Sequence, residues 1–146
     1  MSNPLFYPAI AGVVAILYGL YLIIKIKKLP SGDEKMQKIA GAIQKGAKAY
    51  LKREYRTIAI IAVIILAALL IFFGLKTAIA FFIGAVFSAL AGYIGMLVSV
   101  QANVKCAQAA KDGLKPAFAV AAHGGAVTGF LVTGLALLGL AGFFYF

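Results

Sequence analysis

Four acidic residues are the only carboxylates in this 146-residue chain, and they limit the chemistry it could perform. Asp33 and Glu34 are adjacent at a predicted helix start, where negative charge is favoured by the helix dipole. Glu54 lies among basic residues, and Asp112 stands alone. Magnesium-assisted phosphoryl chemistry needs several oxygen ligands that converge on one cavity. The positions of these four carboxylates in the sequence do not predict such a cavity. We therefore expect no catalytic residue, no metal ligand and no cofactor-binding residue in this chain.

Three other features could suggest chemistry, and each has a simpler interpretation. His123 could titrate near neutral pH, but no carboxylate partner lies in the apolar segments, so an interfacial polar role is favoured over a proton relay. Cys106 is the single cysteine and cannot form an internal disulfide. The glycines around Gly124 and Gly125 lack the lysine of a phosphate-binding loop, so helix packing is the better interpretation.

The elements that would carry these residues are apolar helices. The chain is 64% hydrophobic, with a mean hydropathy of +1.01, which is too apolar for a soluble domain. Four stretches are long enough to cross ~30 Å of hydrocarbon as helices. We predict an all-α fold, a four-span transmembrane helical bundle forming a single domain over residues 1–146. The predicted spans are residues 5–26, 57–75, 77–100 and 118–146.

The net charge of +10 is unevenly distributed along the chain. All Lys and Arg residues except Lys76 lie within residues 25–56 and 105–115. Because basic loops stay on the cytoplasmic side, we expect residues 27–56 and 101–117 to be cytoplasmic, with both ends of the chain outside (N-out/C-out). Topology explains these charges, and no nucleic-acid-binding pattern accompanies them. The expected partner is the lipid bilayer, not nucleic acid.

Between the first two spans, the sequence predicts a cytoplasmic amphipathic helix. Ser31 and Glu34 have the spacing of a capping box, and a helix should begin at about Asp33. Its apolar stripe could lie on the inner leaflet or dock on a larger protein and run straight into span two. The continuous version is favoured because no residue breaks the pattern between Tyr50 and Thr57. Five basic residues are predicted to contact anionic lipid headgroups, at about 1 kcal/mol each: Lys45, Lys48, Lys52, Arg53 and Arg56.

Small residues predict where the helices pack closely. Gly84, Ser88 and Gly92 repeat every four residues in span three, and Gly125 and Gly129 form a GxxxG pair in span four. Such patterns let helix backbones approach one another. Span two has no glycine before residue 74 and should face lipid over much of its surface. The helix of span three should continue past residue 100 to about residue 110, and span four should open near Pro116.

Several segments taken together resemble the N-terminal part of the membrane-bound, ion-translocating pyrophosphatases. The segments are GDEKM (32–36), IAGAIQKGA (39–47), AYL (49–51), GAVFSA (84–89), GYIGM (92–96), ANVK (102–105) and GGAVTG (124–129). The resemblance implies a parent protein that uses magnesium and pyrophosphate to pump protons or sodium ions. It also implies that the catalytic acidic motifs lie on later helices, and none of those motifs occurs here. Gln101, His123 and Thr128 stand where this family commonly has other residues.

We therefore expect the chain to be the N-terminal membrane segment of a pyrophosphate-energised proton or sodium pump in a prokaryotic plasma membrane. It would supply outer-ring scaffold helices and would be inactive alone. Its partners would be the remaining helices of the pump or a homo-oligomer. The alternative is a stand-alone small tetraspan protein with a structural or assembly role. A small multidrug exporter is disfavoured, because such proteins rely on an intramembrane carboxylate.

Overall fold

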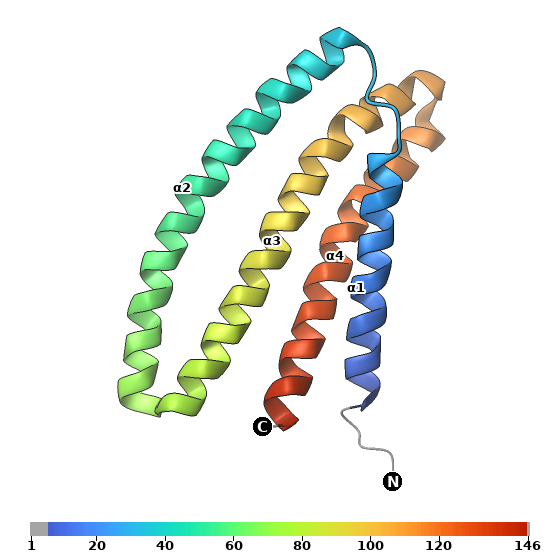
Figure 1. The fold of residues 1–146 in the computed structure, drawn as a ribbon. Helices are drawn as coiled ribbons and strands as arrows, with labels where there is room; N and C mark the ends of the chain where they lie inside the picture. Colours follow the sequence, from blue (N-terminus) through green and yellow to red (C-terminus); the bar gives the residue numbers. More distant parts are fainter. Residues whose placement is uncertain (1–5, 146) are drawn as a thin grey trace.

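The computed structural model describes residues 6–145, and helices make up nearly all of this range (Figure 1). The elements are α1 (Phe6–Lys27), α2 (Glu34–Phe73), α3 (Leu75–Ala109), the 3₁₀ turn η1 (Ala110–Asp112) and α4 (Leu114–Tyr145). Each of the four α-helices is long and apolar enough to cross a membrane. This confirms the predicted all-α fold with four spans. Leu5 and Phe146, the ends of the first and last predicted spans, lie outside the described residues.

The predicted amphipathic helix and the second span form one continuous helix, α2. This agrees with the favoured prediction, in which the amphipathic helix runs straight into span two. α2 contains 40 residues and is therefore about 60 Å long at 1.5 Å per residue. That is about twice the ~30 Å thickness of the hydrocarbon layer. The apolar residues occupy the second half of α2, so a membrane that held this half would leave the basic first half outside the hydrocarbon.

The helices lie side by side in the order α2, α3, α4, α1, which is not their order in the chain (Figure 1). α4 packs between α1 and α3, whereas α2 contacts only α3 among the described helices. The buried core joins α1, α3 and α4, and its largest members are Leu22, Ile26, Val98, Val127 and Leu131. The layer therefore has α1 at one edge and α2 at the other.

α2 is the least buried helix of the layer. Its buried residues are Ala40 and Leu51, both in its basic half, and its most apolar window of 18 residues has none. The second span is rich in isoleucine, leucine and alanine and contains no glycine before Gly74, so it lacks the smallest residue that lets membrane helices approach closely. The exposure predicted for this span is therefore seen in the structure.

Two glycines make the sharp connections on either side of α3. Gly74 alone links α2 to α3 with a φ of 83°, and Gly113 links η1 to α4 with a φ of 121°. Residues with a Cβ rarely adopt such angles. α4 begins at Leu114, slightly before the predicted start near Pro116. Pro116 is tolerated there because the N–H groups of a first helical turn have no partner within the helix.

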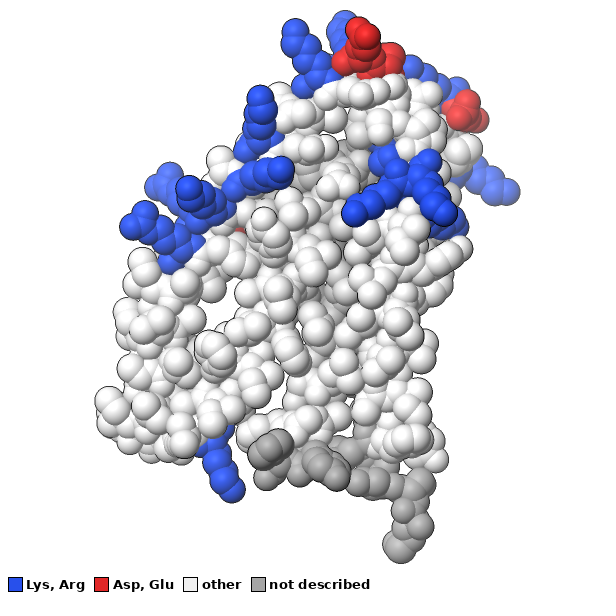
Figure 2. Space-filling model, viewed as in Figure 1, with Lys and Arg blue, Asp and Glu red and all other residues white. Residues whose placement is uncertain are grey.

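The basic side chains gather at one end of the molecule (Figure 2). They surround the end where the α1–α2 loop and η1 lie, and basic atoms also appear at the opposite end, near the α2–α3 connection. Lys76 is the second residue of α3 and so follows this connection directly. The long uncharged region between the two ends suits a bilayer interior, while the side of the membrane that each end occupies remains a prediction.

Candidate functional site

A buried lysine is the most unusual polar feature of the helical packing. Lys105, in α3, is only 7% exposed and is the one buried charged side chain among the described residues. Its Nζ donates to the carbonyl oxygen of Lys27 at 3.2 Å, to the hydroxyl of Ser31 at 3.3 Å and to the carbonyl oxygen of Leu29. An ammonium group has three N–H donors, so each of them can have its own acceptor.

The Lys105 ammonium caps the carboxyl end of α1. The last carbonyl groups of a helix lack partners within the helix, and the helix dipole places partial negative charge there. Burial lowers the pKa of Lys105, because removal from water disfavours the charged form. The hydrogen bonds offset this cost and tie α1, the α1–α2 loop and α3 together at one point.

In the sequence, Lys105 was interpreted as one of the charges that set the orientation and as part of the ANVK segment (102–105), and this contact was missed. The spacing of Lys105 from other residues of α3 is the signal that could have revealed the contact. Ala91, Gly95, Val98, Ala102 and Lys105 follow one another at alternating intervals of four and three residues, and all five are buried. A lysine that continues a buried stripe of small residues is a candidate for an internal cap.

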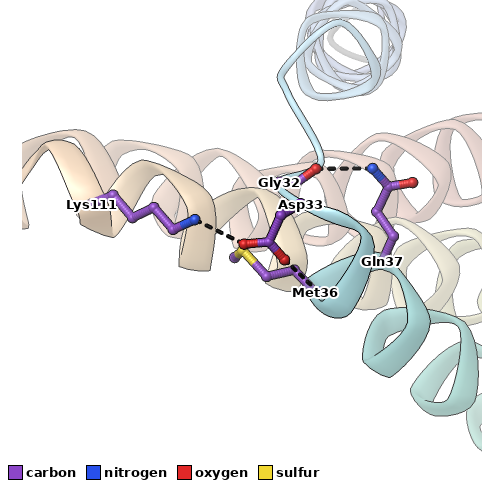
Figure 3. A network of polar contacts seen from close by, with 5 residues as sticks. All are labelled: Gly32, Asp33, Met36, Gln37 and Lys111. Carbon is purple, nitrogen blue, oxygen red and sulfur yellow. Dashed lines mark hydrogen bonds and ion pairs between the residues drawn. The ribbon is translucent and has the colours of Figure 1, made fainter.

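A second polar network fixes the start of α2 (Figure 3). The Asp33 carboxylate accepts a hydrogen bond of 2.9 Å from the backbone N–H of Met36 and pairs with Lys111 at 3.1 Å. The side-chain amide of Gln37 donates to the carbonyl oxygen of Gly32 at 2.9 Å. Through Lys111, which lies in η1, the network links the beginning of α2 to the end of α3.

The predicted capping box is wrong in one respect. Asp33, not Ser31, is the N-cap of α2, because the helix begins at Glu34 and the Asp33 carboxylate accepts from the Met36 N–H. The Ser31 hydroxyl instead accepts from Lys105. Gly32 makes the turn between them with a φ of 80°, and a Cβ there would lie 2.6 Å from the sulfur of Met36 and 3.2 Å from Oε1 of Gln108. The loop therefore needs glycine for both its backbone angle and its space.

We expect acid to loosen the start of α2. The Met36 N–H, and then Lys111, hold the pKa of Asp33 below its ordinary value of 3.8. A carboxyl group with a lowered pKa in the folded state stabilises that state above its ordinary pKa, and this contribution is lost as pH falls through the folded-state value. The protection of the Met36 and Gln37 amides from exchange, relative to their intrinsic exchange rates at the same pH, should fall as the pH drops below about 4.

The Asp33→Ala variant should show weaker protection of the Met36 and Gln37 amides already at neutral pH, with little further loss of protection in acid. Glu34→Gln is the matched control, because Glu34 is also exposed in the first turn but makes no cap. An acid response of Asp33→Ala equal to that of the native protein would contradict the assignment.

Gly92, one of the predicted packing residues, lies against a tyrosine of α2. The Tyr55 hydroxyl donates to the carbonyl oxygen of Ala89 at 2.8 Å, and its ring meets that of Tyr93 edge-on at 5.9 Å. A Cβ at Gly92 would lie 2.9 Å from the Tyr55 hydroxyl. Gly92 thus leaves room for the polar contact that joins α2 to α3.

The other predicted packing residues have no tight contact among residues 6–145. A Cβ at Gly84, Gly125 or Gly129 would have no atom of another part of the chain within 4 Å, and Ser88 is exposed. Their role in helix packing therefore stays a prediction, and it would concern helices other than those described here.

Different glycines make the closest helix contacts. Gly12 of α1 faces Gly134 of α4, and a Cβ on Gly134 would lie 2.8 Å from the Gly12 carbonyl oxygen and 2.6 Å from the Ile16 side chain. Between α3 and α4, a Cβ on Gly95 would lie 2.6 Å from the Thr128 hydroxyl oxygen. α4 therefore contacts its two neighbours through different residues, with Gly134 against α1 and Thr128 against Gly95 of α3.

The five predicted headgroup residues all lie in α2 and are all exposed. Lys45, Lys48, Lys52 and Arg56 share one face of the helix, since they are three or four residues apart. The structure leaves this face free along the basic half of α2 but does not test what binds there.

The remaining candidates do not form a catalytic constellation. Within residues 6–145, no group of three or more His, Cys, Asp or Glu side chains is placed to hold a metal ion. His123 lies beside Lys25, not beside a carboxylate. The Cys106 thiol lies 3.3 Å from the carbonyl oxygen of Ala117 and so bridges α3 and α4. Neither contact places an acid beside a base.

Comparison with known proteins identifies a family. The sequence profile described as "Inorganic H+ pyrophosphatase" matches residues 13–146. The chain is 48% identical over 143 residues to a K(+)-insensitive pyrophosphate-energized proton pump of Methanosarcina mazei, which covers 95% of this chain and 21% of that protein.

Two further relatives give a similar result. The chain is 48% identical over 135 residues to K(+)-insensitive pyrophosphate-energized proton pump 2 of Moorella thermoacetica, covering 92% of this chain and 20% of that protein. It is 43% identical over 129 residues to a putative K(+)-stimulated pyrophosphate-energized sodium pump of Clostridium tetani, covering 88% and 19% respectively. The chain thus spans about one fifth of the length of these relatives.

Proposed function

The chain belongs to the inorganic H⁺ pyrophosphatase family, and from this membership we propose that it supplies scaffold helices to a pyrophosphate-energised ion pump. The observation that carries the proposal is the extent of the matches. Nearly the whole chain aligns with these pumps, yet it corresponds to only about a fifth of each one. The four long apolar helices are suited to membrane support.

In this proposal the chemistry resides in parts of the pump beyond this chain. Magnesium and pyrophosphate would be bound where several carboxylates converge. The described residues do not fit such a site, because both carboxylate oxygens of Asp33 already serve as the α2 cap and the Lys111 partner. The chain alone should therefore neither hydrolyse pyrophosphate nor move ions.

We also propose that the basic end of the molecule faces the cytoplasm of a prokaryotic cell, with both chain ends outside. The support is the gathering of basic side chains at one end (Figure 2) and the rule that such charges stay inside. Arg56, Arg53 and Lys52 lie next to the apolar half of α2 and would contact headgroups first, followed by Lys48 and Lys45. The remaining helices of the pump are the proposed protein partners.

A chimeric pump tests the scaffold role directly. This chain would replace the matching segment of the Methanosarcina mazei pump, and inverted membrane vesicles would be assayed for pyrophosphate-dependent phosphate release and proton uptake. We expect the chimera to hydrolyse and pump, and we expect no activity from the reconstituted chain alone or from the pump with the segment deleted.

Two results would contradict the proposal. Phosphate release above background by the chain alone would place catalysis within it. Full activity of the deleted pump would show that the segment is dispensable. A discrete homo-oligomer of the isolated chain, broken by Gly129→Leu, would instead support a stand-alone tetraspan protein.

A further inference from the structure

Lys25 of α1 and His123 of α4 form a basic pair across the α1–α4 contact. The Lys25 Nζ lies within hydrogen-bonding distance of Nε2 of His123, at 3.5 Å, with Lys25 exposed and His123 half-buried. Neither residue takes part in the one ion pair of the described region, which joins Lys111 to Asp33. Two basic groups that converge without a carboxylate favour a bound anion, because an anion between them accepts charge-assisted hydrogen bonds from both.

An aromatic surface continues from this pair toward the middle of the helices. Tyr21 and Tyr18 precede Lys25 by four and seven residues, and Phe130 follows His123 by seven, so each lies on the same helix face as its basic residue. The rings of Tyr18 and Phe130 are 4.9 Å apart and meet edge-on, and those of Tyr18 and Tyr21 are 5.9 Å apart. All three side chains remain between 37% and 55% exposed.

The order of these groups matches the order of groups in a phospholipid. Tyr21 lies about 6 Å, and Tyr18 about 10 Å, from the level of Lys25 along α1. A phospholipid placed against α1 and α4 would bring its phosphate to the basic pair and its first acyl carbons to the aromatic rings. Tyrosines commonly lie at this depth of the membrane, and basic pockets between membrane helices bind anionic headgroups.

We propose that the surface formed by Lys25, His123, Tyr21, Tyr18 and Phe130 is a binding site for one anionic phospholipid. The phosphate accepts hydrogen bonds from the Lys25 ammonium and the His123 imidazole, and an acyl chain lies along the aromatic rings. A free phosphate ion would contact only Lys25 and His123 and would leave the aromatic rings without a ligand. The proposed occupant is therefore a lipid. The site lies on α1 and α4, away from the basic half of α2.

Native mass spectrometry of the purified chain in detergent, titrated with phosphatidylglycerol or phosphatidylcholine, tests the site. We expect a tightly bound phosphatidylglycerol and weaker binding of phosphatidylcholine. Lys25→Ala/His123→Ala should weaken phosphatidylglycerol binding about five-fold or more. The matched control is Lys38→Ala, which removes the same formal charge from an exposed position of α2 and should leave the affinity unchanged.

Three further measurements complete the test. Lys25→Arg should retain binding, which separates loss of the site from loss of folding. Tyr18→Ala/Tyr21→Ala should weaken phosphatidylglycerol binding without affecting any binding of glycerol phosphate. Inorganic phosphate in large excess should not displace the lipid. Equal losses in Lys38→Ala and in the double variant, or displacement by inorganic phosphate, would overturn the proposal.

Discussion

Replacing Lys105 with methionine should destabilise the folded chain by about 1–3 kcal/mol, because it removes the charged donor that three partly buried acceptors share. Methionine is similar in length and suits apolar surroundings, so the change removes the ammonium group and little volume. The carbonyl oxygens of Lys27 and Leu29 and the Ser31 hydroxyl would lose their shared partner. The free energy of unfolding in mixed micelles, measured by titration with denaturing detergent, reports the loss.

The part of the chain that Lys105→Met loosens is as informative as the loss in stability. Limited proteolysis of Lys105→Met should cut the α1–α2 loop, residues 28–33, faster than it cuts the native protein. Lys38→Met is the control, since Lys38 is exposed in α2 and such surface changes usually stay within about 0.5 kcal/mol. Equal stabilities of the two variants would show that Lys105 does not hold the loop.

The Gly134→Ala variant should separate α1 from α4. The added Cβ would lie 2.6 Å from Ile16 Cγ1, 2.8 Å from the Gly12 carbonyl oxygen and 3.2 Å from the Ile16 backbone nitrogen. Two of these atoms belong to backbone, so a side-chain rotation cannot relieve the clash and the helices must move apart. Overpacking of this kind costs about 1–3 kcal/mol, which a lower midpoint of thermal unfolding in detergent would reveal.

The same substitution at Gly129 is the matched control. Gly129 lies five residues earlier in α4, and a Cβ there would meet no atom within 4 Å. Gly129→Ala should therefore be neutral or slightly stabilising, since alanine favours a helix over glycine by about 1 kcal/mol. If Gly134→Ala were as stable as Gly129→Ala, α1 and α4 could not approach as closely as the structure shows.

The helices themselves could be predicted because their signals are local. The absence of any breaker between Tyr50 and Thr57 predicted the continuous α2, and the glycine after Asp112 predicted the end of the α3 segment. The distribution of Lys and Arg along the sequence predicted which segments form the polar end and which form the apolar spans. Such features depend on neighbouring residues, which the sequence presents directly.

The pairing of helix faces could not be predicted in the same way. α4 carries small residues on several faces, and Gly134 and Gly129 look alike in the sequence although only Gly134 meets another helix here. Which face is used depends on the order α2, α3, α4, α1, which no local pattern encodes. Lys105 was overlooked for a related reason, because its acceptors lie more than 70 residues away in the chain.

The arrangement of the layer has a consequence for biosynthesis. α2 meets α3 across a single residue, whereas the neighbour of α1 in the layer is α4, which begins only at Leu114. At ~5–20 residues per second, the ribosome needs several seconds to make the chain between them. The newly inserted α1 therefore stays in the bilayer without its neighbour α4 while the α2–α3 hairpin forms first. Once α4 has been translated, it packs between α1 and α3 and completes the layer.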